Sequence, residues 1–99
     1  MTANFSVPAD FKVKYLQRKN EELGICRTHV ESRRFEMIRT MAHQMKGNAK
    51  NFEFPLLAEL AIQLEDAANA ENPLQAKLVL ADIQKAVDGL LNRLAGPHH

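Results

Sequence analysis

This sequence of 99 residues has a single cysteine, no long apolar run and no marked excess of charge of one sign. Cys26 is the single cysteine, so the chain cannot form an internal disulfide or a cysteine-rich metal site. The longest apolar runs contain only a few residues, far fewer than the roughly 20 that cross a bilayer. The net charge of +1 excludes the general positive field that is typical of nucleic-acid-binding proteins.

Several kinds of chemistry are excluded because their residue patterns are also missing. A di-metal carboxylate site in a helical bundle needs Glu-x-x-His pairs, and the sequence contains none. Cys26 and His29 have the spacing of neighbours on a helix, but two ligands do not make a zinc site. Glycine-rich phosphate loops and arrays of exposed aromatics are absent, and candidates for a catalytic triad are few. We therefore expect no bound metal and no nucleic-acid partner.

The chain is long enough for one hydrophobic core, so we expect a single domain over residues 1–99. Its N-terminus lacks the positive and then apolar order of a signal peptide, which together with the single cysteine predicts a cytoplasmic protein without membrane contact. Phe5 and Val7 are expected to dock a short N-terminal lead-in on the core. His98 and His99 resemble the start of an affinity tag and are excluded from function.

Apolar residues recur at helical spacing in four segments, and no segment alternates as a strand does. The sequence predicts helices over residues 8–30, 33–51 and 55–70, and a fourth from residue 73 that Gly96-Pro97 ends. Connections as short as these join antiparallel neighbours. We therefore expect an all-α fold, an antiparallel up-down four-helix bundle.

Proline and capping residues mark the ends of the predicted helices. Ser32 is the expected N-cap of the second helix. Phe54-Pro55 ends that helix, because a residue before proline avoids the α region, and Pro55 then begins the third. Asn72-Pro73 is the same device with an added N-cap, and it begins the fourth helix.

The predicted core consists of the apolar residues that share one face of each helix. Gly24 is expected to bend the first helix or to end it early. Lys12, Lys14, Arg18 and Lys19 are expected to form a solvated face of that helix. The inward residues of the four predicted helices are Tyr15, Leu16, Leu23, Cys26 and Val30; then Phe35, Ile38, Ala42, Met45, Ala49 and Phe52; then Leu56, Leu57, Leu60, Ala61, Leu64, Ala67 and Ala68; then Ala76, Val79, Leu80, Ile83, Ala86, Val87, Leu90, Leu91 and Leu94.

His43 lies off the apolar stripe of the second predicted helix, about 100° around the helix axis from its buried neighbour. Lys46, Gly47 and Lys50 follow it at i+3, i+4 and i+7, and Arg39 precedes it at i−4. One flank of one helix therefore carries a histidine, three cations and a glycine. A glycine within a helix costs about 1 kcal/mol relative to alanine, and close approach of another molecule beside His43 would compensate for that cost.

An exposed imidazole with cations beside it suits a transferable phosphoryl group. Free imidazole has a pKa of about 6.5, and its neutral form is a good nucleophile. The cations favour the neutral ring and offset the charge of an attached phosphate. The alternative interpretation is a surface histidine without a function, which is the ordinary case for an arbitrary histidine.

The stretch from Ala42 to Phe52 closely resembles the motif of histidine phosphotransfer (HPt) domains. That motif is alanine-histidine, any residue, leucine or methionine, lysine, glycine and a small residue, ending in asparagine or a similar residue and phenylalanine; this chain has A-H-Q-M-K-G-N-A-K-N-F. The family is a four-helix bundle whose histidine is exposed midway along its second helix. One departure is Glu53, where the family often has glycine, and it changes how the second helix ends.

The resemblance implies a role for each matching residue. His43 would be the phosphoacceptor through its Nε2 atom, Lys46 would neutralise the phosphoryl group, and Gly47 would open the surface. The chain would be a phosphocarrier without autokinase activity. The residues expected to contact a docked partner are Arg39, Thr40, Gln44 and Lys50.

The resemblance also implies the partners. Response-regulator receiver domains hold an aspartyl phosphate and Mg²⁺ in an acidic pocket and would dock on the face that carries His43, where the phosphoryl group passes reversibly between aspartate and imidazole. A hybrid sensor histidine kinase would belong to the same relay. The chain itself would need no cofactor and would act as a monomer.

Two alternatives remain open at this point. An HPt-like docking module would bind receivers or a kinase without carrying phosphate, and it would keep its complexes after His43→Gln. An unrelated structural bundle would self-associate through an exposed region around Met37 and Met41 and would bind no receiver.

Overall fold

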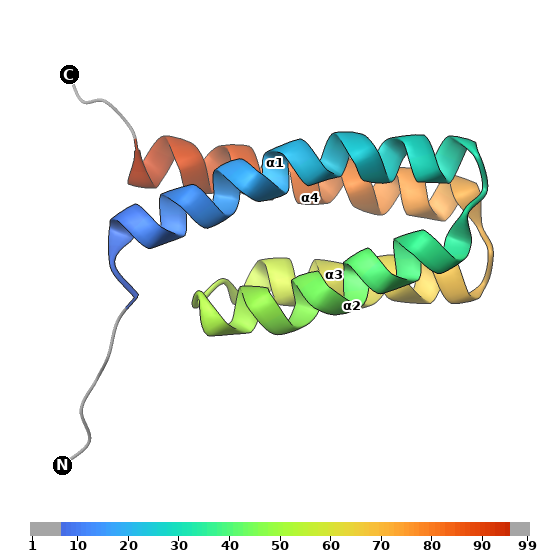
Figure 1. Ribbon diagram of the computed structural model, residues 1–99, viewed down its shortest axis with the longest axis horizontal. Coiled ribbons are helices and arrows are strands. Elements are labelled where there is room, and N and C mark those ends of the chain that lie inside the picture. Colours follow the sequence, from blue (N-terminus) through green and yellow to red (C-terminus); the bar gives the residue numbers. More distant parts are fainter. Residues whose placement is uncertain (1–6, 96–99) are drawn as a thin grey trace, which may run out of the picture.

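The structure, a computed structural model, describes residues 7–95, and these residues form four helices. In chain order they are α1 (Ala9–Glu31), α2 (Phe35–Asn51), α3 (Pro55–Asn69) and α4 (Pro73–Leu94) (Figure 1). The described residues contain no strand, so the predicted all-α class is confirmed.

Figure 1 shows the helices as two pairs, α1 beside α4 and α2 beside α3. Each helix is also a neighbour of the next one along the chain, whereas α1 and α3, like α2 and α4, are not neighbours. This ring of contacts is that of the predicted antiparallel up-down bundle. The packing is closest between α2 and α3 and loosest between α1 and α2.

All three connections between helices have the same geometry, which is the Schellman motif. The residue after each C-cap has a left-handed backbone, with φ of 57° at Arg33, 67° at Glu53 and 52° at Glu71. In the second connection the amide of Phe54 donates to the carbonyl of Ala49 at 2.8 Å, and the other two contain the equivalent bond. A left-handed backbone costs a non-glycine residue about 1 kcal/mol, so each connection carries some strain.

Glu53, the departure from the HPt pattern noted above, has the backbone conformation that glycine usually adopts. Its φ of 67° is the conformation for which glycine is the usual choice. Here the glutamate is held from α1, because Lys12 Nζ lies 3.0 Å from Glu53 Oε1. Tyr15 of α1 also stacks on Phe52, with ring centroids 4.3 Å apart, so the connection between α2 and α3 is fastened to α1.

The capping predictions were partly right. The side chain of Asn72 accepts a hydrogen bond from the Gln75 amide at 3.0 Å, which confirms the N-cap of α4. Ser32 is not the N-cap of α2 but the C-cap of α1. The Schellman turn occupies three residues before α2 can begin at Phe35, so Arg34 becomes the N-cap, without a side-chain hydrogen bond.

The core is built mainly from the predicted inward residues of all four helices. The stripe on α2 is buried as predicted, with Phe52 half-buried at its end, and it fixes which side of α2 faces solvent. The largest side chains that are fully buried are Leu16, Leu23, Val30, Ile38, Leu57, Leu64, Val79, Leu80, Ile83 and Val87.

Two predictions about individual side chains were wrong, and of the two outcomes expected at Gly24 the early end of the helix does not occur. Leu56 is 57% exposed, because the inward face of α3 begins at Leu57. Lys19 is buried rather than solvated, because it lies one turn from Tyr15 on the inward side of α1. Gly24 does not end α1, which continues to Glu31.

Some predictions concern residues at the ends of the chain. Val7 is half-buried, whereas Phe5, Gly96-Pro97 and the last two histidines lie outside the described residues. Among the helices that the structure describes, none has the length and apolar character needed to traverse a bilayer.

Candidate functional site

The imidazole of His43 projects from the middle of α2 into solvent. Its neighbours Ala42 and Met45 are buried in the core, and this anchors the helix with His43 on the outside. The side chain of His43 is 68% exposed. A second protein can therefore reach it directly.

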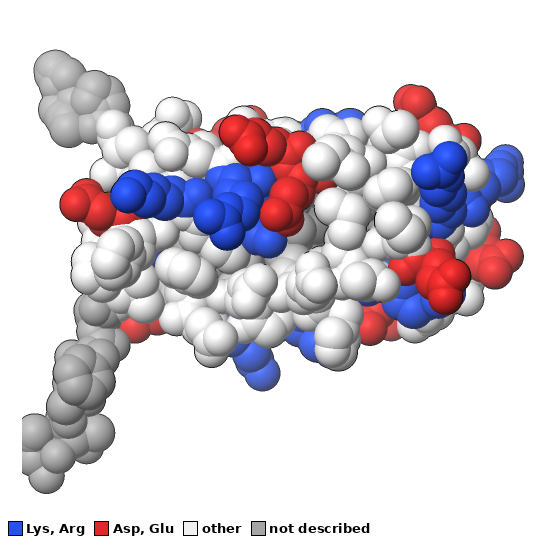
Figure 2. All heavy atoms as spheres, in the orientation of Figure 1, with Lys and Arg blue, Asp and Glu red and all other residues white. Residues whose placement is uncertain are grey.

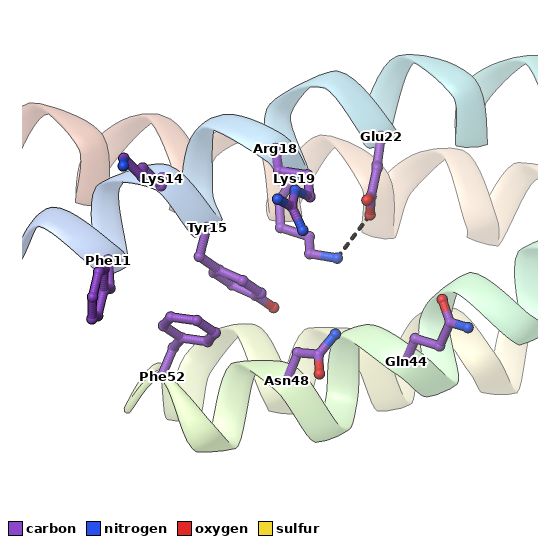
Figure 3. A pocket seen from close by; sticks show the side chains of 9 residues that line it. All are labelled: Phe11, Lys14, Tyr15, Arg18, Lys19, Glu22, Gln44, Asn48 and Phe52. Carbon is purple, nitrogen blue, oxygen red and sulfur yellow. Dashed lines mark hydrogen bonds and ion pairs between the residues drawn. The ribbon is translucent and has the colours of Figure 1, made fainter. Parts of the chain in front are cut away.

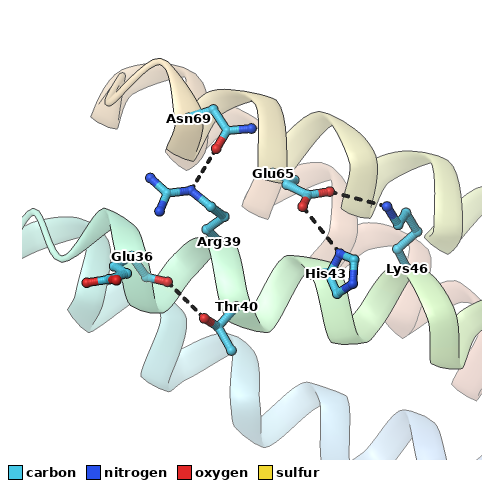
Figure 4. A network of polar contacts seen from close by, with 7 residues as sticks. All are labelled: Glu36, Arg39, Thr40, His43, Lys46, Glu65 and Asn69. Atoms are coloured by element: carbon cyan, nitrogen blue, oxygen red, sulfur yellow. Dashed lines mark hydrogen bonds and ion pairs between the residues drawn. The ribbon is translucent and has the colours of Figure 1, made fainter.

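A carboxylate from α3 lies beside the ring. Glu65 Oε2 is 3.4 Å from His43 Nδ1, and Glu65 Oε1 is 3.5 Å from Lys46 Nζ (Figure 4). The Glu65 side chain is only 21% exposed, so it is held between the two helices. One carboxylate thus contacts both the imidazole and the lysine.

Glu65 was missed by the sequence analysis, although a signal for it exists. Short connections fold α2 and α3 back on each other, so residues equally far from Phe54 along the chain face one another. His43 and Glu65 are such a pair, and so are Arg39 and Asn69, whose side chains are hydrogen-bonded from Nε to Oδ1 at 2.6 Å. Pairing the two helices in this way would have placed a carboxylate opposite His43.

The position of Glu65 distinguishes the two ring nitrogens. A carboxylate next to Nδ1 favours a proton on that nitrogen, and the lone pair of the neutral ring is then on Nε2. Figure 4 shows Nδ1 turned towards α3. The ring is therefore arranged to react through its outward nitrogen.

The cations on this flank do not surround the imidazole as the sequence suggested. Arg39 points towards Asn69 at the end of α3, away from His43, as Figure 4 shows. Lys46 shares the Glu65 carboxylate with the ring, while Lys50 is exposed farther along α2. The hydroxyl of Thr40 donates to the backbone carbonyl of Glu36 at 3.1 Å. Of the three predicted cations, Lys46 is therefore the one that shares a contact with the ring.

Gly47 faces open space. Apart from the adjoining backbone of its own helix, a Cβ atom built at this position would meet no atom of the described residues within 4 Å, and the φ of Gly47 is not positive. Neither internal packing nor backbone conformation therefore requires glycine here. The same is true of Gly24 and Gly89, so open space alone does not distinguish Gly47; its place one turn after His43 does.

Gln44 lies on the flank of α2 opposite Glu65. It lines a groove between α1 and α2 together with Asn48 and residues of α1 (Figure 3). The predicted docking residues are therefore divided between two flanks: Arg39 lies towards α3 and Gln44 towards α1.

The other reactive side chains of α1 do not form a competing site. Cys26 is buried, and burial raises the pKa of its thiol to about 11, so it stays protonated. His29 Nδ1 is buried and has no hydrogen-bond partner among the residues that the structure describes. Within residues 7–95, no three side chains of the metal-binding types come together as a cluster.

Comparison with known proteins identifies the family. The family model described as Hpt domain matches residues 10–96, which is nearly the whole chain. No curated protein and no solved structure matched the chain in the same comparisons.

Proposed function

This chain belongs to the Hpt domain family, whose members carry phosphoryl groups on a histidine in phosphorelays, and we propose that His43 is the residue that carries the group here. It would accept the group from the phospho-aspartate of a receiver domain, or from a kinase, and pass it to the aspartate of another receiver. The observation that supports this most is the exposed ring of His43, with Nδ1 facing Glu65 and Nε2 outward. The family consists of phosphocarriers rather than enzymes in the usual sense.

The transfer would be an in-line displacement at phosphorus. The lone pair of Nε2 forms a P–N bond while the P–O bond to the receiver's aspartate breaks, and the aspartate leaves as a carboxylate. The ring then carries a positive charge and keeps its proton on Nδ1. Glu65 accepts that proton in a hydrogen bond and stabilises the charge, which is the usual effect of a carboxylate behind a histidine.

Lys46 would neutralise charge on the phosphoryl group. Its amine is 3.5 Å from the Glu65 carboxylate, so a modest rotation of the flexible side chain can bring it to a phosphate on His43. Gly47 would let the backbone of the partner approach the ring. The bundle thus supplies a nucleophile, a cation and a shape, while most of the catalytic charge comes from the partner.

The proposed partners are receiver domains and a kinase. Mg²⁺ and a catalytic lysine would belong to the receiver, and the chain itself would need no cofactor. A hybrid sensor histidine kinase would stand upstream, the protein would work as a monomer, and the relay would operate in the cytoplasm.

The direct test is phosphoryl transfer from purified receiver domains carrying radioactive phospho-aspartate. Wild-type protein should become labelled, and His43→Gln should abolish the label without changing the circular dichroism spectrum. His29→Gln is the matched control, because His29 is the other histidine among the described residues, and it should keep the label. Binding of a receiver without any labelling of the wild type would instead favour a docking module.

A further inference from the structure

A groove of about 510 Å³ lies between α1 and α2, where the two helices pack most loosely. We call it the α1–α2 groove and define it by the aromatic residues Phe11, Tyr15 and Phe52 and by Lys14, Arg18 and Gln44. Figure 3 shows Phe11, Tyr15 and Phe52 turned towards the space between the helices, whereas Lys14 extends along α1. Gln44 follows His43 directly in α2, so a protein seated on His43 can also reach the groove.

The groove contains a buried polar group without a partner. The Tyr15 side chain is 7% exposed, and its hydroxyl has no hydrogen-bond partner within the described residues. Stacking on Phe52, with ring centroids 4.3 Å apart, holds the ring, so the hydroxyl oxygen keeps its place in the groove. Burial, followed by the charge of Glu22, raises the pKa of Tyr15, and the phenol therefore remains a donor. In Figure 3 this donor points along the groove towards Lys19 and Asn48.

The charge in the groove is mainly positive. Lys19 is 5% exposed, and its amine contacts Glu22 at 2.7 Å, which neutralises one cation. Lys14 and Arg18 are exposed, and neither has an ion pair within residues 7–95. Figure 2 shows the resulting basic cluster over the N-terminal half of α1, next to the largely uncharged surface of α2. The groove therefore offers two unneutralised cations, one buried donor and an exposed aromatic ring.

We propose that the α1–α2 groove selects receiver domains by docking an acidic and partly apolar segment beside the receiver's phosphorylation pocket. A carboxylate of that segment would lie between Lys14 and Arg18, a second acceptor would take the Tyr15 hydroxyl, and an apolar side chain would cover Phe11. This inference rests on the proposed function, because it assumes that a receiver sits on His43.

Charge complementarity supports this occupant. A receiver gathers carboxylates in the pocket that holds its Mg²⁺ and phospho-aspartate, so the surface that it presents to His43 is acidic. On the α3 side of His43, Lys46 is paired with Glu65. On the α1 side, Lys14 and Arg18 have no ion pair within the described residues. Opposite charges across an interface mainly accelerate association and discriminate between partners. Lys14 and Arg18 are therefore docking residues and not part of the transfer chemistry.

The test compares a protein donor with a small one. Phosphoramidate labels histidines without a docked protein, so it measures the reactivity of His43 alone. The variant K14E/R18E should label normally with phosphoramidate, whereas its rate of transfer from phosphorylated receivers, and its affinity for them, should fall about tenfold or more at low salt. The wild-type transfer rate should also fall with added salt, and the variant should lose that dependence.

The matched control is K77E/K85E, which makes the same change of charge on α4, a helix that is not a neighbour of α2. Both residues are exposed, so this variant should behave like the wild type in both reactions. A second variant, Tyr15→Phe, keeps the ring and removes the hydroxyl. It should weaken receiver binding about fivefold or more, because the acceptor on the receiver loses its donor, while its melting temperature should not fall.

Three results would overturn the inference. The first is a transfer rate for K14E/R18E within twofold of the control at low salt, and the second is an equal loss in the phosphoramidate reaction. The third is sedimentation showing that a second copy of the chain occupies the groove. If the proposed function fails, no donor labels His43. The groove can still be tested in that case, by comparing the affinity of receivers for His43→Gln with their affinity for the same variant carrying K14E/R18E.

Discussion

Glu65 holds its carboxylate 3.4 Å from the Nδ1 atom of His43, although the two residues belong to different helices. The tight connection between α2 and α3 sets this distance, because it brings residues equally far from Phe54 face to face. The same carboxylate is 3.5 Å from Lys46 Nζ. The α2–α3 pair, rather than α2 alone, therefore builds the proposed site.

Removing the Glu65 carboxylate should slow both transfer reactions. In Glu65→Ala the ring loses the group that favours a proton on Nδ1 and stabilises the charge of the phosphorylated ring. We expect labelling by receivers and by phosphoramidate to slow about tenfold, which is the usual effect of losing the partner behind a reactive histidine. Glu59→Ala, an exposed substitution on the same helix, is the control and should leave both rates unchanged. A loss with the receiver alone would show that Glu65 acts in docking.

A methyl group at Gly47 should make the protein more stable but slow its reaction with receivers. Gly47→Ala should raise the free energy of unfolding by about 1 kcal/mol, since the new Cβ meets no atom within 4 Å. It should also slow transfer from receivers, because the methyl group occupies space that the partner uses, while labelling by phosphoramidate should stay unchanged.

Gly89→Ala on α4 is the matched control for this variant, because a Cβ there also meets open space. It should give the same stabilisation in urea unfolding and leave transfer intact. Equal transfer rates for the two alanine variants would show that the glycine in the motif has no role in docking.

The left-handed residues in the connections predict a stabilising substitution. Glu71→Gly should raise the free energy of unfolding by about 0.5 to 1 kcal/mol, since glycine adopts a φ of 52° without a Cβ clash. Glu59→Gly in the interior of α3 should have the opposite effect, about 1 kcal/mol of destabilisation. Urea unfolding measures both, and a destabilised Glu71→Gly would contradict the left-handed geometry.

The buried thiol predicts how stability depends on pH. Burial raises the pKa of Cys26 to about 11 from the ordinary thiol value of 9.0, so above pH 9 the unfolded chain binds fewer protons than the folded one. The stabilisation from the neutral thiol is complete below pH 9 and is lost as pH rises to 11, by about 2 to 3 kcal/mol. Cys26→Ala should show a shallower fall across this range in urea unfolding. Parallel curves for the two proteins would contradict it, since Tyr15 is present in both.

Much of the fold could be predicted because local signals determine it. Apolar residues at helical spacing and the prolines Pro55 and Pro73 locate the helices, and the stripe on α2 places His43 outside. The sequence could not give Lys19 an inward position, because polar residues interrupt the apolar face of α1. It also gave no sign of the left-handed Arg33 and Glu71, which hold a conformation where glycine is usual.

The site was harder to predict because it depends on two helices. The stretch from Ala42 to Phe52 supplies the candidate histidine, lysine and glycine from one segment. Glu65 lies far along the chain, and its role follows only from the register between α2 and α3. The groove likewise needs both α1 and α2, and neither segment shows a hollow by itself.

The most direct test of the central claim is nuclear magnetic resonance of protein with ¹⁵N-labelled histidine, recorded before and after phosphorylation by phosphoramidate. The coupling between phosphorus and the ring nitrogens identifies the atom that carries the phosphoryl group. The predicted result is a P–N bond at Nε2 of His43, with the proton retained on Nδ1. A phosphoryl group on Nδ1 of His43, or on His29, would contradict it.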